Sequence, residues 1–85
     1  MNNRITFAQF DAVLDELGFQ QIVVPGSHVT YRHPPTGAIL MVRLHSPSDF
    51  VPDYVMVGTR HELDWRGVVS AQDFEDALNR STPAA

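Results

Sequence analysis

The apolar residues near the start of the chain follow a helical period. They recur every three or four positions, so one stripe of a helix would face a core while the acidic residues between them stay in water. The stripe consists of Phe7, Phe10, Val13, Leu14 and Leu17. Thr6 precedes it as an N-cap with Gln9 as its capping-box partner, and Gly18 supplies a stop. The pattern therefore predicts an amphipathic helix over residues 6–18.

The hydrophobic period then changes to that of β-strands. The segment FQQIVV (19–24) predicts a short strand that ends at a Pro-Gly turn. The segment HVTYRH (28–33) alternates between polar and apolar residues, and AILMVRLH (38–45) is the most apolar of the three. The PPTG sequence between them is typical of a hairpin connection. We therefore expect three antiparallel strands in a meander.

The regular hydrophobic period is lost in SPSDFVP (46–52). The sequence that follows predicts a second helix. This helix, DYVMVGTRHELDWRG (53–67), would end at Gly67, because glycine is the usual residue beyond a helix end. Aromatic side chains contribute large apolar areas to cores. We therefore expect Tyr54 and Trp65 to anchor the helix in the core, and assign them no function.

A last helix is predicted for AQDFEDALNR (71–80). Ser70 precedes it, with an aspartate three residues later, in an arrangement that resembles a helix cap. Phe74 and Leu78 would pack inward from this helix. We expect the STPAA segment (81–85) to be a frayed end.

The order of these elements describes a two-layer α+β domain. We expect a three-stranded antiparallel sheet with helices packed on one face, in the order α-β-β-β-α with one additional C-terminal helix. A chain of 85 residues predicts a single domain, 1–85, whose core covers about residues 6–78. No apolar run approaches the ~20 residues of a membrane span, and the first ten residues lack the pattern of a secretory signal. We therefore expect no membrane partner and a cytoplasmic location.

Strand alternation divides the predicted sheet into two faces. On the second strand, Val29 and Tyr31 share the apolar side, which should face the helices. We expect three residues of the third strand on the same side: Leu40, Val42 and Leu44. The opposite side then gathers His28, Thr30, Arg32, Ile39, Met41, Arg43 and His45. Two histidines and two arginines are thus predicted to converge where the sheet meets solvent or a ligand.

Acidic and basic residues are segregated along the chain. It has 6 arginines, no lysine and 10 acidic residues, and the net charge of −4 argues against a general nucleic-acid binder. Every acidic residue, however, lies within 11–16 or 49–76, whereas residues 17–48 contain none. This acid-free block holds His28, Arg32, His33, Arg43 and His45. We expect a locally positive strip that can attract a phosphate at close range.

Histidine is the strongest candidate for chemistry in this chain. The absence of cysteine excludes disulfides, thiolate-zinc sites and cysteine nucleophiles. Histidine exchanges a proton near neutral pH and arginines can hold a phosphate, a combination that fits phosphodiester cleavage. The four histidines lack the short spacing of a metal site, so we expect neither a metal nor another cofactor. The alternative is that His28 and His45 are ordinary surface residues and the arginines only solubilise an open sheet.

Several motifs resemble one protein family. They are LGF (17–19), GSHVTYRHP (26–34) with its glycine-serine-histidine core, then Gly37, an apolar strand and a later histidine. Across residues 6–78 they resemble the HicA-like, or YcfA-like, toxins of bacterial toxin–antitoxin systems. The resemblance implies a fold like that of a double-stranded-RNA-binding domain. It also implies a metal-independent RNA endonuclease, an mRNA interferase, with His28 as the catalytic residue, RNA as a partner and a HicB-like antitoxin as its inhibitor.

By this resemblance, His28 would move a proton while a ribose 2′-hydroxyl attacks the adjacent phosphate. From the strand faces, we expect Arg32 and Arg43 to hold phosphate oxygens. The expected RNA-binding residues are Gly26, Ser27, Thr30, Arg32, Arg43 and His45. A second interpretation stays open, in which the chain is a non-catalytic or repurposed module of the same fold that binds RNA or protein.

Overall fold

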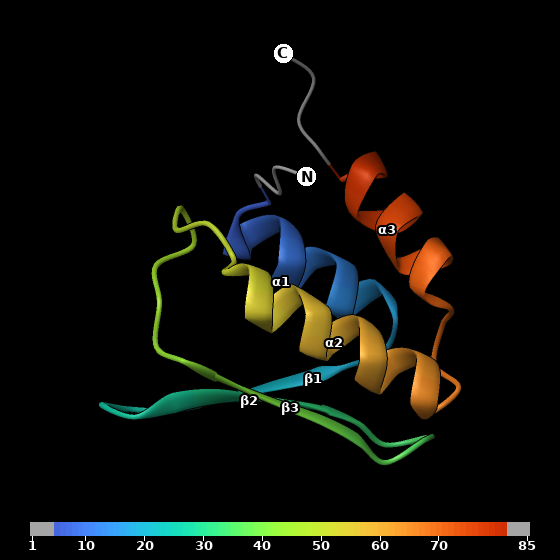
Figure 1. Cartoon of the computed structure of the whole chain (residues 1–85). Helices are drawn as coiled ribbons and strands as arrows, with labels where there is room; N and C mark the ends of the chain where they lie inside the picture. The colour runs from blue at the N-terminus through green and yellow to red at the C-terminus, as the bar shows by residue number, and fades with distance from the viewer. Residues whose placement is uncertain (1–4, 82–85) are drawn as a thin grey trace.

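Helices and strands follow one another in the order α-β-β-β-α-α (Figure 1). The computed structural model describes residues 5–81. The elements are α1 (Phe7–Glu16), β1 (Gln20–Val24), β2 (His28–His33), β3 (Ala38–Arg43), α2 (Asp53–Trp65) and α3 (Ala71–Arg80). The predicted α+β class and the additional C-terminal helix are confirmed. Of the expected frayed end, Ser81 caps α3, and residues 82–85 lie outside the described part. No helix within residues 5–81 combines the length and apolar character that crossing a bilayer requires.

Side-chain caps mark where α1 and α3 begin. The Thr6 hydroxyl accepts a hydrogen bond from the Gln9 N–H at 3.3 Å, and Gln9 Oε1 accepts one from the Thr6 N–H at 2.9 Å, so the predicted capping box is confirmed. Ser70 Oγ accepts in the same way from the Asp73 N–H at 3.1 Å. Beyond α2, Gly67 has a φ of +75°, the left-handed conformation common after a helix end. The predicted stop is therefore present, although α2 itself ends two residues earlier.

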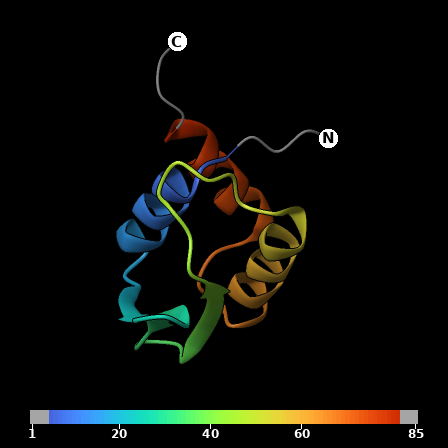
Figure 2. The same cartoon turned by 90° about the vertical axis from the view of Figure 1, so that its left-hand side faces the viewer.

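The central strand of the sheet is β2, which pairs antiparallel with β1 on one side and β3 on the other. The described helices all lie on one side of the sheet, with α3 packed against α1 and α2 (Figures 1 and 2). The turn between β1 and β2 is tight, because the Ser27 N–H donates to the Val24 carbonyl at 3.0 Å. Gly26 sits in this turn with a φ of +74°, which glycine adopts without steric cost. The turn places His28 at the first position of β2.

The inner face of the sheet carries the core, with Tyr31 at its centre. Tyr31 is fully buried, and its ring meets Phe10 edge to face with the ring centroids 5.7 Å apart. The Tyr31 hydroxyl donates a hydrogen bond to Asp11 Oδ1 at 2.6 Å, which ties β2 to α1. Val29, Leu40 and Val42 are also buried. The predicted inward side of β2 and of the first part of β3 is therefore confirmed.

Three apolar residues that were expected in the core are exposed instead. Leu44 is exposed because β3 ends at Arg43, one residue before it, so strand alternation no longer sets its direction. Tyr54 and Trp65 are 71% and 75% exposed, so the expectation that they anchor α2 is wrong. The residues that α2 buries are Met56, Thr59 and Leu63. At about 3.6 residues per turn, burial of these three leaves both aromatic rings on the outward stripe.

The Tyr31–Asp11 contact predicts loss of stability at high pH. Burial, and then the hydrogen bond and charge of Asp11, raise the pKa of the Tyr31 hydroxyl well above its ordinary value. The unfolded chain releases this proton above pH ~10 while the folded chain retains it, so the free energy of unfolding should fall by ~1.4 kcal/mol for each further pH unit. Urea unfolding between pH 8 and pH 11, followed by circular dichroism, measures this slope.

The matched control is Tyr31→Phe, which keeps the buried ring and removes the proton. We expect this variant to lose ~1–2 kcal/mol at neutral pH, since a hydrogen bond to a charged group is removed. Above pH 10 the free energy of unfolding of Tyr31→Phe should fall less steeply with pH than that of the wild type, because the titration of Tyr31 no longer contributes. An equally steep decline in both proteins would show that Tyr31 does not cause it.

Candidate functional site

His28 opens β2 and points to the side of the sheet that faces away from the helices. Its ring is partly exposed, and Nδ1 lies 2.7 Å from Ser27 Oγ. A serine hydroxyl can donate to Nδ1 or accept from it, so this contact is compatible with either neutral tautomer. Nε2, at the other end of the ring, has no hydrogen bond within the described part of the chain. This nitrogen is therefore available to a ligand.

The side chains that share this side define the outer face of the sheet. They are Gln20, Ile22 and Val24 from β1, His28, Thr30 and Arg32 from β2, and Ile39, Met41 and Arg43 from β3. Arg43 lies directly opposite His28 in the strand register. Directly paired residues have Cβ atoms about 5 Å apart, so a guanidinium and an imidazole can act on one bound group. His28, Ser27 and Arg43 thus form the polar centre of the candidate site.

Arg32 and His45 do not join this centre. Arg32 is on the outer face but four residues along β2, ~13 Å from His28. His45 lies beyond the end of β3, where its ring stacks on Phe7 of α1 at a centroid distance of 3.5 Å. Its Nδ1–H donates to the Arg43 carbonyl at 2.8 Å. The expectation that two histidines and two arginines converge is therefore wrong, because Arg32 lies at the other end of β2 and because β3 ends before it can set the direction of His45.

The remaining predicted site residues divide between the turn and the centre of the outer face. Gly26 and Ser27 are exposed in the β1–β2 turn. Thr30 is partly exposed and lies between Ile22 and Met41 in the register. Met41 is 66% exposed, and Ile22 is also exposed, so apolar side chains flank Thr30 on both sides. The outer face therefore combines a polar end around His28 with an apolar middle.

The two arginines of the outer face are not neutralised by acidic residues. Among residues 5–81, neither Arg32 nor Arg43 makes an ion pair, whereas on the helical side Arg60 pairs with Glu75 and Arg66 with Glu62. This difference follows the sequence, since residues 17–48 contain no acid. The unpaired guanidinium groups leave the outer face locally positive despite the net charge of −4.

His33 has a structural role that sequence reasoning missed. It is buried, and its Nε2–H donates to the Leu17 carbonyl at 2.9 Å, at the end of α1. Nδ1 lies 2.8 Å from the Thr36 hydroxyl, which can donate to it. The His33 ring also packs against Phe19, with the centroids 4.9 Å apart. The HxxT spacing from His33 to Thr36 was the one available signal, and it is too short and common to have been diagnostic.

Two of the predicted site residues, Arg43 and His45, also line a hollow in the surface. Its volume is about 490 Å³, and it includes Phe50 and Tyr54. No cluster of three or more histidine and acidic side chains that could hold a metal ion is found within residues 5–81.

No protein-family model matches this chain, and no curated protein matches its sequence.

The two histidines of β2 should respond differently to truncation. His33→Ala leaves the Leu17 carbonyl without its donor and opens space beside Phe19, so we expect a loss of ~2–3 kcal/mol in the free energy of unfolding. His28→Ala removes a ring that fills no core space and should change stability by ~0.5 kcal/mol or less. Urea unfolding of both variants at pH 7, followed by circular dichroism, gives the comparison. A larger loss for His28→Ala would mean that His28 is structural.

Proposed function

We propose that this protein is a HicA-like, metal-independent RNA endonuclease in which His28 moves the proton. The observation that supports it most is the arrangement of the glycine-serine-histidine motif. The Gly26 turn presents His28 on an open face, Ser27 contacts its Nδ1, and the unpaired Arg43 stands opposite. A proton acceptor beside a phosphate-binding cation is what cleavage of RNA by its own 2′-hydroxyl requires.

In the proposed reaction, His28 Nε2 accepts the proton of a ribose 2′-hydroxyl as that oxygen forms a bond to phosphorus. The bond from phosphorus to the 5′ oxygen of the next nucleotide breaks, and that oxygen takes a proton from water. The hydroxide left behind takes the proton that His28 holds, which returns the ring to its neutral form and re-forms water. The products are a 2′,3′-cyclic phosphate and a 5′-hydroxyl. Nδ1 keeps its contact with Ser27 Oγ, which orients the ring. Arg43 stabilises the negative charge that develops on the non-bridging oxygens.

The two arginines have different roles in this proposal. Arg43 faces His28 across the strands and serves the phosphate that reacts. Arg32 is ~13 Å away along β2 and can only contact another phosphate of the same RNA. Thr30 and the apolar side chains between them provide a surface for a sugar or base. His45, which is stacked on Phe7, has no part in binding the phosphate that reacts.

The proposal implies a partner and a location. An enzyme that degrades RNA must be restrained, and a HicB-like antitoxin would do so by covering the outer face around His28. Exposed Ile22, Ile39 and Met41 beside cationic side chains suit a surface that a protein covers. The protein would act in the cytoplasm, where its RNA substrate is found.

Removal of the His28 ring should abolish cleavage without unfolding the protein. His28→Ala loses the proton acceptor, so we expect the cleavage rate of a labelled single-stranded RNA of mixed sequence to fall by about 10²- to 10⁴-fold. His61→Ala is the matched control, because His61 is an exposed histidine on α2, away from the outer face. Rates are measured per folded molecule, with the folded fraction taken from circular dichroism. Equal rates for His28→Ala and the wild type would refute the catalytic role.

The second candidate function is binding without cleavage, and the small number of cations favours it. A protein with only two arginines on its outer face resembles a weak RNA-binding or protein-binding module. Wild-type protein that binds RNA and leaves it intact would support this candidate. Cyclic-phosphate ends that appear with the wild type and not with His28→Ala would exclude it.

The salt dependence of RNA binding should come from the two outer-face arginines, Arg32 and Arg43. In the His28→Ala background, which prevents cleavage, two or three neutralised phosphates predict a slope of about −1.4 to −2 for log K against log salt on single-stranded RNA. Arg43→Ala and Arg32→Ala should each reduce this slope by about 0.7. Arg80→Ala on α3 is the control and should leave it unchanged. Fluorescence anisotropy measures the affinities, and a slope unaffected by both outer-face variants would locate the RNA elsewhere.

A further inference from the structure

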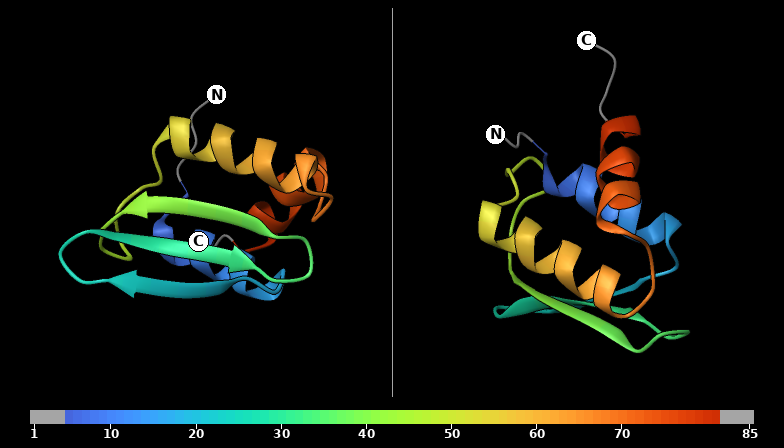
Figure 3. Two further views of the ribbon diagram at one scale, coloured as in Figure 1. Left: turned by 90° about the horizontal axis from the view of Figure 1, so that it is seen from below. Right: turned by 45° about the vertical axis from the view of Figure 1, so that its right-hand side comes forward.

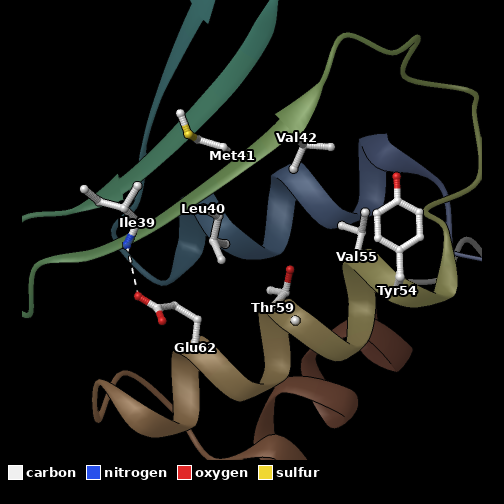
Figure 4. Close-up of a pocket in the computed structure, with 9 residues that line it drawn as sticks. Ile39, Leu40, Met41, Val42, Tyr54, Val55, Thr59 and Glu62 are labelled. Carbon is white, nitrogen blue, oxygen red and sulfur yellow. Dashed lines mark hydrogen bonds between the residues drawn. The ribbon is translucent and has the colours of Figure 1, made fainter.

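A groove runs between β3 and α2, on the opposite edge of the sheet from β1 (Figure 4). Its volume is about 310 Å³. One wall is the edge of β3, and the other is formed by Tyr54, Val55, Gly58, Thr59 and Glu62 of α2. None of these α2 residues belongs to the site around His28. The groove is therefore a surface feature separate from that site.

The β3 wall is an unpaired sheet edge, part of whose backbone is open. Among the described residues the sheet order is β1-β2-β3, so β3 pairs with β2 on one side only. The Ile39 N–H donates to Glu62 Oε2 at 3.4 Å, which shows that the backbone of Ile39 points away from β2. Backbone groups alternate along a strand, so those of Met41 and Arg43 point the same way. The Arg43 carbonyl already accepts from His45 Nδ1–H, and the Ile39 N–H would have to exchange Glu62 for a new partner, so the Met41 N–H and carbonyl are the open groups of this edge. An edge of this kind is a template for one more strand.

α2 shapes the groove for a single strand. It lies above β3 and extends beyond the strand's edge, so an added strand would run beneath it (Figures 2 and 3). A second copy of this chain, paired with β3 through a twofold axis, would bring its own α2 into the space that the first α2 occupies. The geometry therefore favours an isolated extended segment over a second copy.

Gly58 keeps the groove open, and nothing among residues 5–81 requires a glycine there. A Cβ added at Gly58 would meet no atom of these residues within 4 Å, and its φ is not positive. Glycine inside a helix is less stable than alanine by ~1 kcal/mol. The residue thus lowers helix stability without improving any internal contact, while it leaves space in the wall of the groove.

Two charged residues, Glu62 in the groove and Arg43 just beyond its β3 wall, define the chemistry of the occupant. Glu62 Oε2 already accepts hydrogen bonds from the Ile39 N–H and from Arg66 Nε, but Oε1 has no partner within the described residues. At the other end of β3, Arg43 has no ion pair among these residues. An occupant with a basic residue at the Glu62 end and an acidic residue at the Arg43 end would satisfy both groups.

We propose that this groove binds an extended segment of a partner protein, which pairs antiparallel with β3 as a fourth strand. Its N-terminal end lies opposite Arg43 and carries an acidic residue, and its C-terminal end lies beside Glu62 and carries a basic one. The residues that point toward α2 are apolar and fill the space beside Gly58 and Val55. This binding does not depend on ribonuclease activity or on His28.

A defined peptide tests the proposal. The probe is acetyl-Glu-Val-Thr-Val-Thr-Lys-amide, whose valines would point toward α2 when its glutamate lies opposite Arg43. We expect saturable shifts of the Met41 and Arg43 amide resonances in nitrogen-15 NMR spectra, with slower hydrogen exchange at Met41. The control peptide has proline in place of the first threonine, which removes the donor opposite Met41, and it should not bind. Absence of saturable shifts at millimolar peptide would overturn the proposal.

Variants of α2 test where the peptide lies. Gly58→Leu fills the groove and should weaken peptide binding by about tenfold or more while the helix remains folded. Val57→Leu is the matched control, because Val57 is exposed but does not line the groove, and the affinity should be unchanged. Equal affinity for both variants would refute the location.

Three further outcomes separate this proposal from its alternatives. Dimers in analytical ultracentrifugation that disappear with Gly58→Leu would assign the groove to a second copy and overturn the proposal. Shifts of the same amides caused by single-stranded RNA and not by the peptide would assign it to RNA, with the same consequence. Unchanged peptide affinity in His28→Ala is expected, and it keeps the failure of the ribonuclease proposal distinct from the failure of this one.

Discussion

The burial of Tyr31 decides how the rest of the sheet is oriented. Its ring packs against Phe10, and its hydroxyl donates to Asp11, so β2 is held against α1 by both apolar contact and a hydrogen bond. Successive side chains of a strand point to opposite sides. Once Tyr31 and Val29 are turned inward, His28 must point outward. The exposure of the candidate catalytic residue is therefore a consequence of the core.

The same constraint fixes what can lie beside His28. The register places Arg43 opposite it, and the β1–β2 turn places Ser27 next to it. The segregation of acidic residues leaves this face positive although the whole chain is negative. The chemistry proposed for His28 would therefore depend on two or three local contacts, and long-range attraction of an RNA would be weak. A site of this kind suits a substrate that is bound at few phosphates.

The outer face and the β3 groove meet along one strand. Ile39, Met41 and Arg43 place their side chains on the outer face and their backbone groups toward α2. A strand bound in the groove would extend the outer face beyond β3 and bring its own side chains next to Met41 and Arg43. The two surfaces can thus be occupied by one partner or by two, and a protein bound at the groove is well placed to control access to His28.

The local features of this chain were determined by its sequence. Short-range periods and hydrogen bonds determine the caps at Thr6 and Ser70, the stop at Gly67, the three strands and the inward side of Tyr31. Each of these features is confirmed.

Only the tertiary structure decided the rest. Strand alternation stops where β3 ends. The directions of the Leu44 and His45 side chains are set instead by the packing of the loop that follows. Tyr54 and Trp65 are apolar enough for a core. The way α2 packs on the sheet, however, turns Met56 and Leu63 into the core and leaves the two aromatic rings outside. The groove beside Gly58 arises from the same placement, because which stripe of a helix faces a neighbour depends on residues far away in the sequence.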